Sequence, residues 1–123
     1  MSTPAKHVLV VDDDPFVLTF VQRSLEQYRV TTMLDPREAV AFVAGREPLD
    51  LLITDYFMPG ITGDAVVARA RECRPDLKVL VLTGYSAIIE HTNPTWWRTV
   101  PHLDKPFSPE HLRTVVEGQI GAP

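Results

Sequence analysis

The sequence predicts an α/β fold: an open, doubly wound, parallel sheet of five strands with helices on both faces. The apolar runs are short and continuous, which is typical of strands buried on both sides of a parallel sheet. They are separated by segments of helical periodicity, as in repeated βα units. Proline and glycine are spread between these segments without a linker, so we expect one domain covering residues 1–123.

The strands are predicted from the position of the apolar runs. Residues 7–11, 51–54 and 78–83 are the clearest strands, because each is almost entirely apolar. Residues 29–33 are a weaker strand, and a short fifth strand is expected around Leu103.

Three of the helices are predicted to begin at an Asp-Pro or Ser-Pro pair. The first residue of such a pair caps the helix, and proline suits the first helical position. A further helix is expected over residues 64–73, and Pro94 interrupts the segment 86–100. We therefore expect a shortened or irregular fourth helix followed by an irregular loop. The three pairs are Asp14-Pro15, Asp35-Pro36 and Ser108-Pro109.

Composition argues against several classes of protein. A net charge of −4 with scattered Lys and Arg does not favour binding to nucleic acid or to an acidic membrane. No apolar run approaches the roughly 18 residues of a membrane span, and the N-terminus has no apolar core of a signal peptide. Cys73 is the single cysteine, so there is no internal disulfide. The expected location is the cytoplasm.

Five residues with useful chemistry follow the predicted strands, and the carboxyl ends of parallel strands meet at one edge of a sheet. Three carboxylates there need a counter-charge, which a hard divalent cation supplies: Mg²⁺ is the usual choice, and Mn²⁺ is an alternative. A cation, an ammonium and a hydroxyl around a carboxylate are suited to phosphoryl transfer. The residues are Asp12, Asp13, Asp55, Thr83 and Lys105, with Asp55 as the candidate nucleophile.

Four stretches carry a resemblance to a known family: "VLVVDDDP", "LLITDYFMPGITG", "VLTGYS" and "LDKPF", in this order. With them the chain resembles the receiver domain of two-component response regulators, of the chemotaxis-receiver type, over essentially its whole length. The resemblance implies a flavodoxin-like sheet with strand order 2-1-3-4-5.

The resemblance also implies a metal site and a phosphoacceptor. Asp12 and Asp13 would be the acidic pair that holds Mg²⁺. Asp55 would be both a metal ligand and the phosphoacceptor, and the backbone carbonyl of Phe57 would complete the protein ligands. Asp14, by contrast, is interpreted as a helix cap.

Thr83 and Lys105 would hold the phosphoryl oxygens, and the Lys105–Pro106 peptide would be cis. The donor would be a sensor histidine kinase or a histidine phosphotransfer protein. The added charge of about −1.5 to −2 would then reshape the face formed by helix four, strand five and the C-terminal helix. This face would bind a downstream partner or a second copy of the chain. Such a domain is a switch, which at most catalyses its own phosphorylation and dephosphorylation.

The chain departs from the family at a few positions. His102 stands where the family usually has Tyr or Phe, and it is either an edge-strand histidine or a switch residue whose output depends on pH. Trp96 and Trp97 are adjacent, so we expect one to pack and the other to lie on the partner-binding face. Phe57 and Tyr85 flank the site, where their bulk is expected to prolong the life of the acyl phosphate.

Two alternatives belong to other classes. The Asp-x-Asp pattern of Asp12 and Asp14 also occurs in haloacid-dehalogenase-like phosphatases, as nucleophile and general acid, but this leaves Asp55 unexplained. The second alternative is a receiver-like docking module that no longer accepts phosphate. The chain is interpreted either as a stand-alone regulator or as a receiver from a longer protein such as a hybrid kinase.

Overall fold

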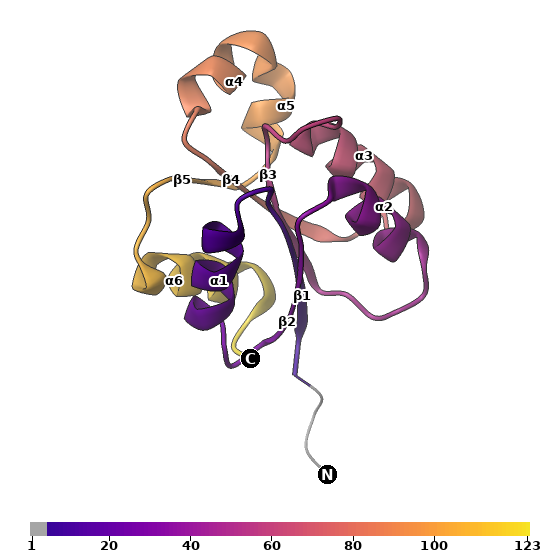
Figure 1. The fold of residues 1–123 in the computed structure, drawn as a ribbon, viewed down its shortest axis with the longest axis vertical. Helices are drawn as coiled ribbons and strands as arrows, with labels where there is room; N and C mark the ends of the chain where they lie inside the picture. Colours follow the sequence, from indigo (N-terminus) through magenta and orange to yellow (C-terminus); the bar gives the residue numbers. More distant parts are fainter. Residues whose placement is uncertain (1–4) are drawn as a thin grey trace.

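A five-stranded parallel sheet forms the centre of the molecule in a computed structural model that describes residues 5–123 (Figure 1). The strand order is β2-β1-β3-β4-β5, as the family resemblance implies. Residues 1–4, part of the N-terminal stretch expected to lack a signal peptide, lie outside the described residues. The strands are β1 (His7–Val11), β2 (Arg29–Met33), β3 (Leu51–Asp55), β4 (Lys78–Thr83) and β5 (His102–Asp104).

Helices cover both faces of the sheet, which explains why the strands are continuously apolar. Alternate residues of β1 point to opposite faces: Val8 and Val10 pack with the helices of one side, Leu9 and Val11 with those of the other. The first side consists of α1 (Pro15–Ser24) and α6 (Pro109–Ile120). The second consists of α2 (Pro36–Ala44), α3 (Gly63–Cys73), α4 (Ser86–Thr92) and α5 (Pro94–Thr99).

The helix starts predicted from the Asp-Pro and Ser-Pro pairs are confirmed. Asp14 Oδ1 accepts a hydrogen bond from the backbone N–H of Phe16, over 2.9 Å. Asp35 and Ser108 cap α2 and α6 in the same way. Each cap satisfies a backbone donor that the helix itself leaves without a partner.

The segment after β4 confirms one prediction and corrects another. The fourth helix is short, as expected, but the irregular loop expected after it is wrong: Pro94 begins α5. Proline is compatible with the first position of a helix, where its missing N–H has no intrahelical role. Asn93 joins the two helices, because its N–H donates to Ile89 and its carbonyl accepts from Trp97.

A search of residues 5–123 for a helix both long and apolar enough to cross a bilayer finds none.

Candidate functional site

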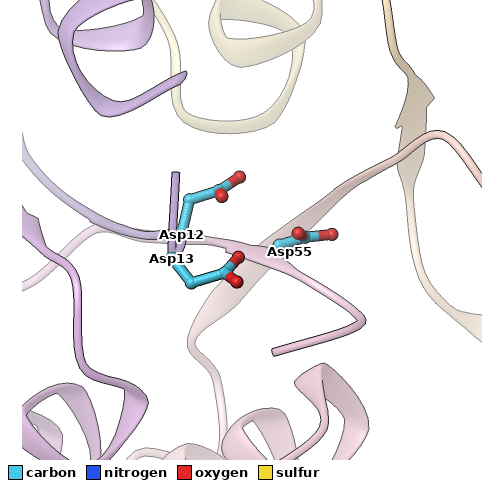
Figure 2. A group of neighbouring side chains, drawn as sticks. All are labelled: Asp12, Asp13 and Asp55. Atoms are coloured by element: carbon cyan, nitrogen blue, oxygen red, sulfur yellow. The ribbon is translucent and has the colours of Figure 1, made fainter. Parts of the chain in front are cut away.

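Three carboxylates meet at the carboxyl ends of two neighbouring strands. Asp12 and Asp13 follow β1 directly, and Asp55 is the last residue of β3 (Figure 2). The pairing of Val11 with Thr54 places these strand ends side by side. One oxygen from each of the three carboxylates lies within 4.8 Å of the others, as the sequence predicted for a shared site.

Lys105 brings an ammonium into this acidic cluster from the loop between β5 and α6. Its Nζ donates to Asp12 Oδ2 over 2.9 Å and lies 3.5 Å from Asp55 Oδ2. The backbone N–H of Lys105 is bonded to the carbonyl of Thr83, and the Lys105–Pro106 peptide is cis, as the resemblance implies. The lysine therefore bridges Asp12, which follows β1, and Asp55, which ends β3.

Thr83 is the last residue of β4 and is fully buried. In the sheet, Asp55 is paired with Leu82, so Thr83 extends one residue beyond the level of Asp55. Its Oγ1 accepts a hydrogen bond from the N–H of Tyr85 over 3.1 Å. The hydroxyl is thus tied to the start of α4 as well as to the edge of the sheet.

The backbone after β3 orients the Asp55 carboxylate. Oδ1 accepts a hydrogen bond of 2.7 Å from the N–H of Tyr56, and the carbonyl of Tyr56 accepts one of 2.7 Å from Gly63. A Cβ on Gly63 would meet the backbone oxygen of Asp55 more closely than real Cβ atoms approach backbone. Gly63 thus permits the close approach that shapes the site.

The remaining acid of the DDD run has a different position. Asp14 caps α1, and its own N–H donates to Asp12 Oδ1 over 2.9 Å. Both oxygens of Asp12 are engaged, one by Asp14 and the other by Lys105. This arrangement does not favour the phosphatase alternative, in which Asp12 attacks and Asp14 donates a proton.

The electrostatic balance leaves the cluster short of positive charge. Burial raises the pKa of the Asp55 carboxyl, and the neighbouring charge of Asp12 adds to this; Lys105 and the N–H of Tyr56 oppose the shift without cancelling it. For Lys105, burial alone would lower the pKa, but its hydrogen bond to Asp12 and the charges of Asp12 and Asp55 outweigh burial and raise the pKa. The ammonium is therefore favoured, and the carboxylates need further counter-charge.

The donor set fits a small, hard divalent cation. Mg²⁺ prefers oxygen ligands at about 2.0–2.1 Å in an octahedron, which separates ligand oxygens by about 3–4 Å. One carboxylate oxygen each from Asp12, Asp13 and Asp55 lies within 4.8 Å of the other two, so small adjustments bring these three oxygens to such a geometry. Phe57 lies in the loop directly after β3, and its ring packs edge-on against Tyr56 and Tyr85.

The residues predicted for the switch and for the partner face lie outside the acidic cluster. His102 is exposed on the edge strand β5, and its ring stacks on Trp97 with centroids 3.9 Å apart. Trp97 is 4% exposed, so the prediction that one tryptophan packs is confirmed. Trp96 is half-buried and contacts Tyr56.

Comparison with known proteins identifies the family. A family model described as "Response regulator receiver domain" matches residues 8–117. The chain is 34% identical over 113 residues to the response regulator receiver protein CpdR of Brucella abortus, covering 90% of this chain and 91% of that protein. It is also 34% identical over 126 residues to the hydrogenase transcriptional regulatory protein HoxA of Cupriavidus necator, covering 99% of this chain but 26% of HoxA.

Among solved structures, the chemotaxis protein CheY4 of Vibrio cholerae superposes with a TM-score of 0.82 at 28% identity, covering 94% of this chain and 98% of that one. The receiver domain of the hybrid histidine kinase CckA superposes with a TM-score of 0.76 at 29% identity, covering 93% and 98% of the two chains. The strand order and the two helical layers thus belong to the flavodoxin-like fold of CheY. The chain belongs to the receiver-domain family of two-component response regulators, whose members are signalling switches.

Proposed function

We propose that Asp55 is the phosphoacceptor of this receiver domain. Support comes from exposure combined with charge. The side chain of Asp12 is 1% exposed and that of Asp55 is 13% exposed, so a phosphoryl donor can reach Asp55 but not Asp12. Asp55 also lies 3.5 Å from the Lys105 ammonium, which is the observation that carries the proposal.

Asp12, Asp13 and Asp55 would hold Mg²⁺, or Mn²⁺ in its place, with the backbone carbonyl of Phe57 as a further ligand. When bound, the cation neutralises charge on the phosphoryl oxygens and on the three carboxylates. Such compensation favours the ionised form of Asp55, which is the nucleophilic form.

The reaction we propose is a single phosphoryl transfer. A carboxylate oxygen of Asp55 forms a bond to phosphorus while the P–N bond of a phosphohistidine breaks. The electron pair of that bond stays on the imidazole, which leaves as a neutral ring because its other nitrogen carries a proton. Lys105 and Thr83 then hold the phosphoryl oxygens through the ammonium and the hydroxyl.

The donor is a sensor histidine kinase or a histidine phosphotransfer protein, and the expected location is the cytoplasm. The chain acts as one domain over residues 1–123. Its own chemistry is limited to phosphorylation and dephosphorylation of Asp55. Phe57 and Tyr85 slow the dephosphorylation by shielding the acyl phosphate.

CpdR is almost the same length as this chain, whereas the chain spans about a quarter of HoxA. Both a stand-alone regulator and a receiver within a longer protein therefore have precedents among the relatives.

Phosphorylation would shift the population between two packings of the face made by α4, α5, β5 and α6. Thr83 would move toward the new phosphoryl oxygens, and His102 on the adjacent β5 would act as the switch residue. A downstream protein or a second copy of this chain would bind the reshaped face, with the half-buried Trp96 as a contact, whereas Trp97 packs in the core.

The test is the intact mass of the protein after incubation with acetyl phosphate, with and without Mg²⁺. We expect one added phosphoryl group that depends on Mg²⁺ and is absent from Asp55→Asn. Asp76→Asn, which removes an exposed carboxylate from the loop between α3 and β4, is the matched control and keeps the adduct. A natural chain that gains no phosphoryl group and does not respond to beryllofluoride with Mg²⁺ would overturn the proposal in favour of a docking module.

A further inference from the structure

The two adjacent tryptophans of α5 contact different parts of the site. Trp96 packs against Tyr56, the residue directly after Asp55, with ring centroids 5.5 Å apart. Trp97 stacks on His102, which begins β5 and lies three residues before Lys105 in the chain. One short helix therefore lies against the segments that carry both the acceptor and the lysine (Figure 1).

The contact through Tyr56 leads directly to the Asp55 carboxylate. The N–H of Tyr56 donates to Asp55 Oδ1 over 2.7 Å, so a change in the charge or direction of this carboxylate acts on the Tyr56 backbone. Tyr56 is 7% exposed, and its ring packs against those of Trp96 and Phe57. A buried aromatic ring in close packing cannot move without displacing its neighbours.

Asn93 fastens the junction of α4 and α5 to the same region. Its Nδ2 donates to Asp64 Oδ2 over 3.1 Å, and it lies 3.5 Å from the hydroxyl of Tyr56. Asp64 in turn accepts a hydrogen bond from Thr62, in the loop that leads from β3 into α3. The side chain of Asn93 thus joins two helices to the loop that follows Asp55.

The contact through His102 follows a separate route. His102 and Trp97 are nearly parallel, with 26° between the ring planes. β5 continues from His102 into the loop that carries Lys105, whose N–H is bonded to the carbonyl of Thr83. A movement of Lys105 from Asp12 toward a phosphoryl group on Asp55 would pull on this strand.

We propose that α5 couples two parts of the site, the phosphoacceptor Asp55 and the lysine Lys105. Trp96, with Asn93 at the start of the helix, links α5 to Asp55 through Tyr56. Trp97 links α5 to Lys105 through His102. This inference rests on the proposed phosphorylation of Asp55. It adds a second path, through Tyr56, by which a change at Asp55 would reach the partner-binding face made by α4, α5, β5 and α6. The paired tryptophans, which the family resemblance leaves without a role, are then the two contacts of one coupling element.

The experiment uses the two tryptophans as separate reporters. Trp97→Phe leaves Trp96 as the single fluorophore of its kind, and Trp96→Phe leaves Trp97. Emission is recorded as beryllofluoride and Mg²⁺ are added, and intact mass after acetyl phosphate treatment shows whether each variant still accepts phosphate. We expect adducts in both variants and a change in emission in both.

A third substitution tests the role of Asn93. In the Trp97→Phe background, Asn93→Ala is expected to weaken the Trp96 response while phosphate uptake persists, because the direct contact between Trp96 and Tyr56 remains. In the Trp96→Phe background, the same change leaves the Trp97 response in place. Thr92→Ala is the matched control, because the hydrogen bond of the Thr92 hydroxyl, to the carbonyl of Ile88, lies within α4. Tyr56→Phe removes the hydroxyl next to Asn93 and is the second variant should Asn93→Ala fail to fold.

The outcomes separate the inference from the function on which it rests. If phosphate is accepted but Trp96 emission does not change, the coupling through Tyr56 is wrong and the proposed function stands. If Trp96 emission changes equally with and without the Asn93 side chain, the link through Asn93 is wrong and the proposed function again stands. If neither acetyl phosphate nor beryllofluoride affects the protein, the proposed function fails and the coupling inference fails with it.

Discussion

α6 and the α4–α5 segment both pack against the sheet, but different interactions stabilise them. α6 has 12 residues, begins with a Ser108 cap and a proline, and places Leu112 and Val116 in the core. α4 and α5 have 7 and 6 residues, and neither has a capping side-chain hydrogen bond within the described part of the chain. Their contacts come from elsewhere in the sequence, through Ile89, Trp97 and Asn93.

This difference shows which part of the molecule is suited to switching. Helices shorter than about 12 residues have little stability of their own in water, so α4 and α5 depend on tertiary packing. Elements that move in a switch are drawn from the least stable parts of a protein. The α4–α5 segment contacts both Tyr56, next to Asp55, and His102, on the strand before Lys105. Its local stability depends on these same contacts.

The largest expected effect is a difference in local unfolding between the two regions. Backbone amides of α4 and α5 should exchange hydrogen through openings about 3 kcal/mol or more below those of α6, because few residues must unfold to release them. Native-state hydrogen exchange measures both values in one sample. Equal opening free energies in the two regions would remove the comparison.

Gly63→Ala should cost about 1–3 kcal/mol of unfolding free energy. The new Cβ meets the backbone of Asp55 and Tyr56, which cannot move aside as a flexible side chain can. Because Tyr56 supports Trp96, we expect the variant also to speed hydrogen exchange in α5 more than in α6. Urea denaturation gives the free energy; a variant as stable as the natural protein would contradict the close approach.

Ser108→Ala should destabilise the protein by about 1 kcal/mol, because it removes the acceptor for the N–H of His111, 3.0 Å away. Thermal or urea unfolding measures the change, and Ser108→Asp, which retains a capping oxygen, is the control. If the Ser108→Ala and Ser108→Asp variants have the same free energy of unfolding, the cap does not stabilise α6, and this helix depends on tertiary packing as α4 and α5 do.

Gly118→Ala is the smallest expected effect and has the opposite sign. Gly118 lies within α6, and apart from the adjoining residues and the backbone of the same helix, no heavy atom of the described residues is within 4 Å of a Cβ placed there. Alanine should therefore stabilise the protein by about 0.5–1 kcal/mol through helix propensity. The free energies of unfolding of Gly118→Ala and Gly63→Ala are compared with each other. The comparison separates the general effect of replacing glycine by alanine from the steric clash that arises only at Gly63.

Much of the site could be predicted from the sequence because its residues end strands that are themselves recognisable. Asp12, Asp13 and Asp55 follow apolar runs, and the parallel arrangement of those runs makes their ends converge. The stronger partner of Lys105 was not predictable, since its 2.9 Å contact is with Asp12, 93 positions earlier in the chain. The close approach of Gly63 also required coordinates, because no local pattern shows that the start of α3 comes close to the backbone of Asp55 and Tyr56.

The α4–α5 segment shows the limit of reading a proline locally. Pro94 was interpreted as the end of helical structure, yet it is the first residue of α5. A proline can end one helix and begin the next, and sequence alone does not say whether a following segment will find a surface to pack on. Here Trp97 and Val100 pack in the same core cluster as apolar residues of β4.

The sequence by itself determined the parallel sheet, the capped helices and the acidic cluster with its lysine. Each of these follows from interactions within a few residues, or from apolar runs that have one way to be buried. Only the tertiary structure decided that α5 exists, that Trp96 contacts Tyr56, and that Trp97 stacks on His102. These features depend on how distant elements pack together, and a local pattern carries no record of that packing.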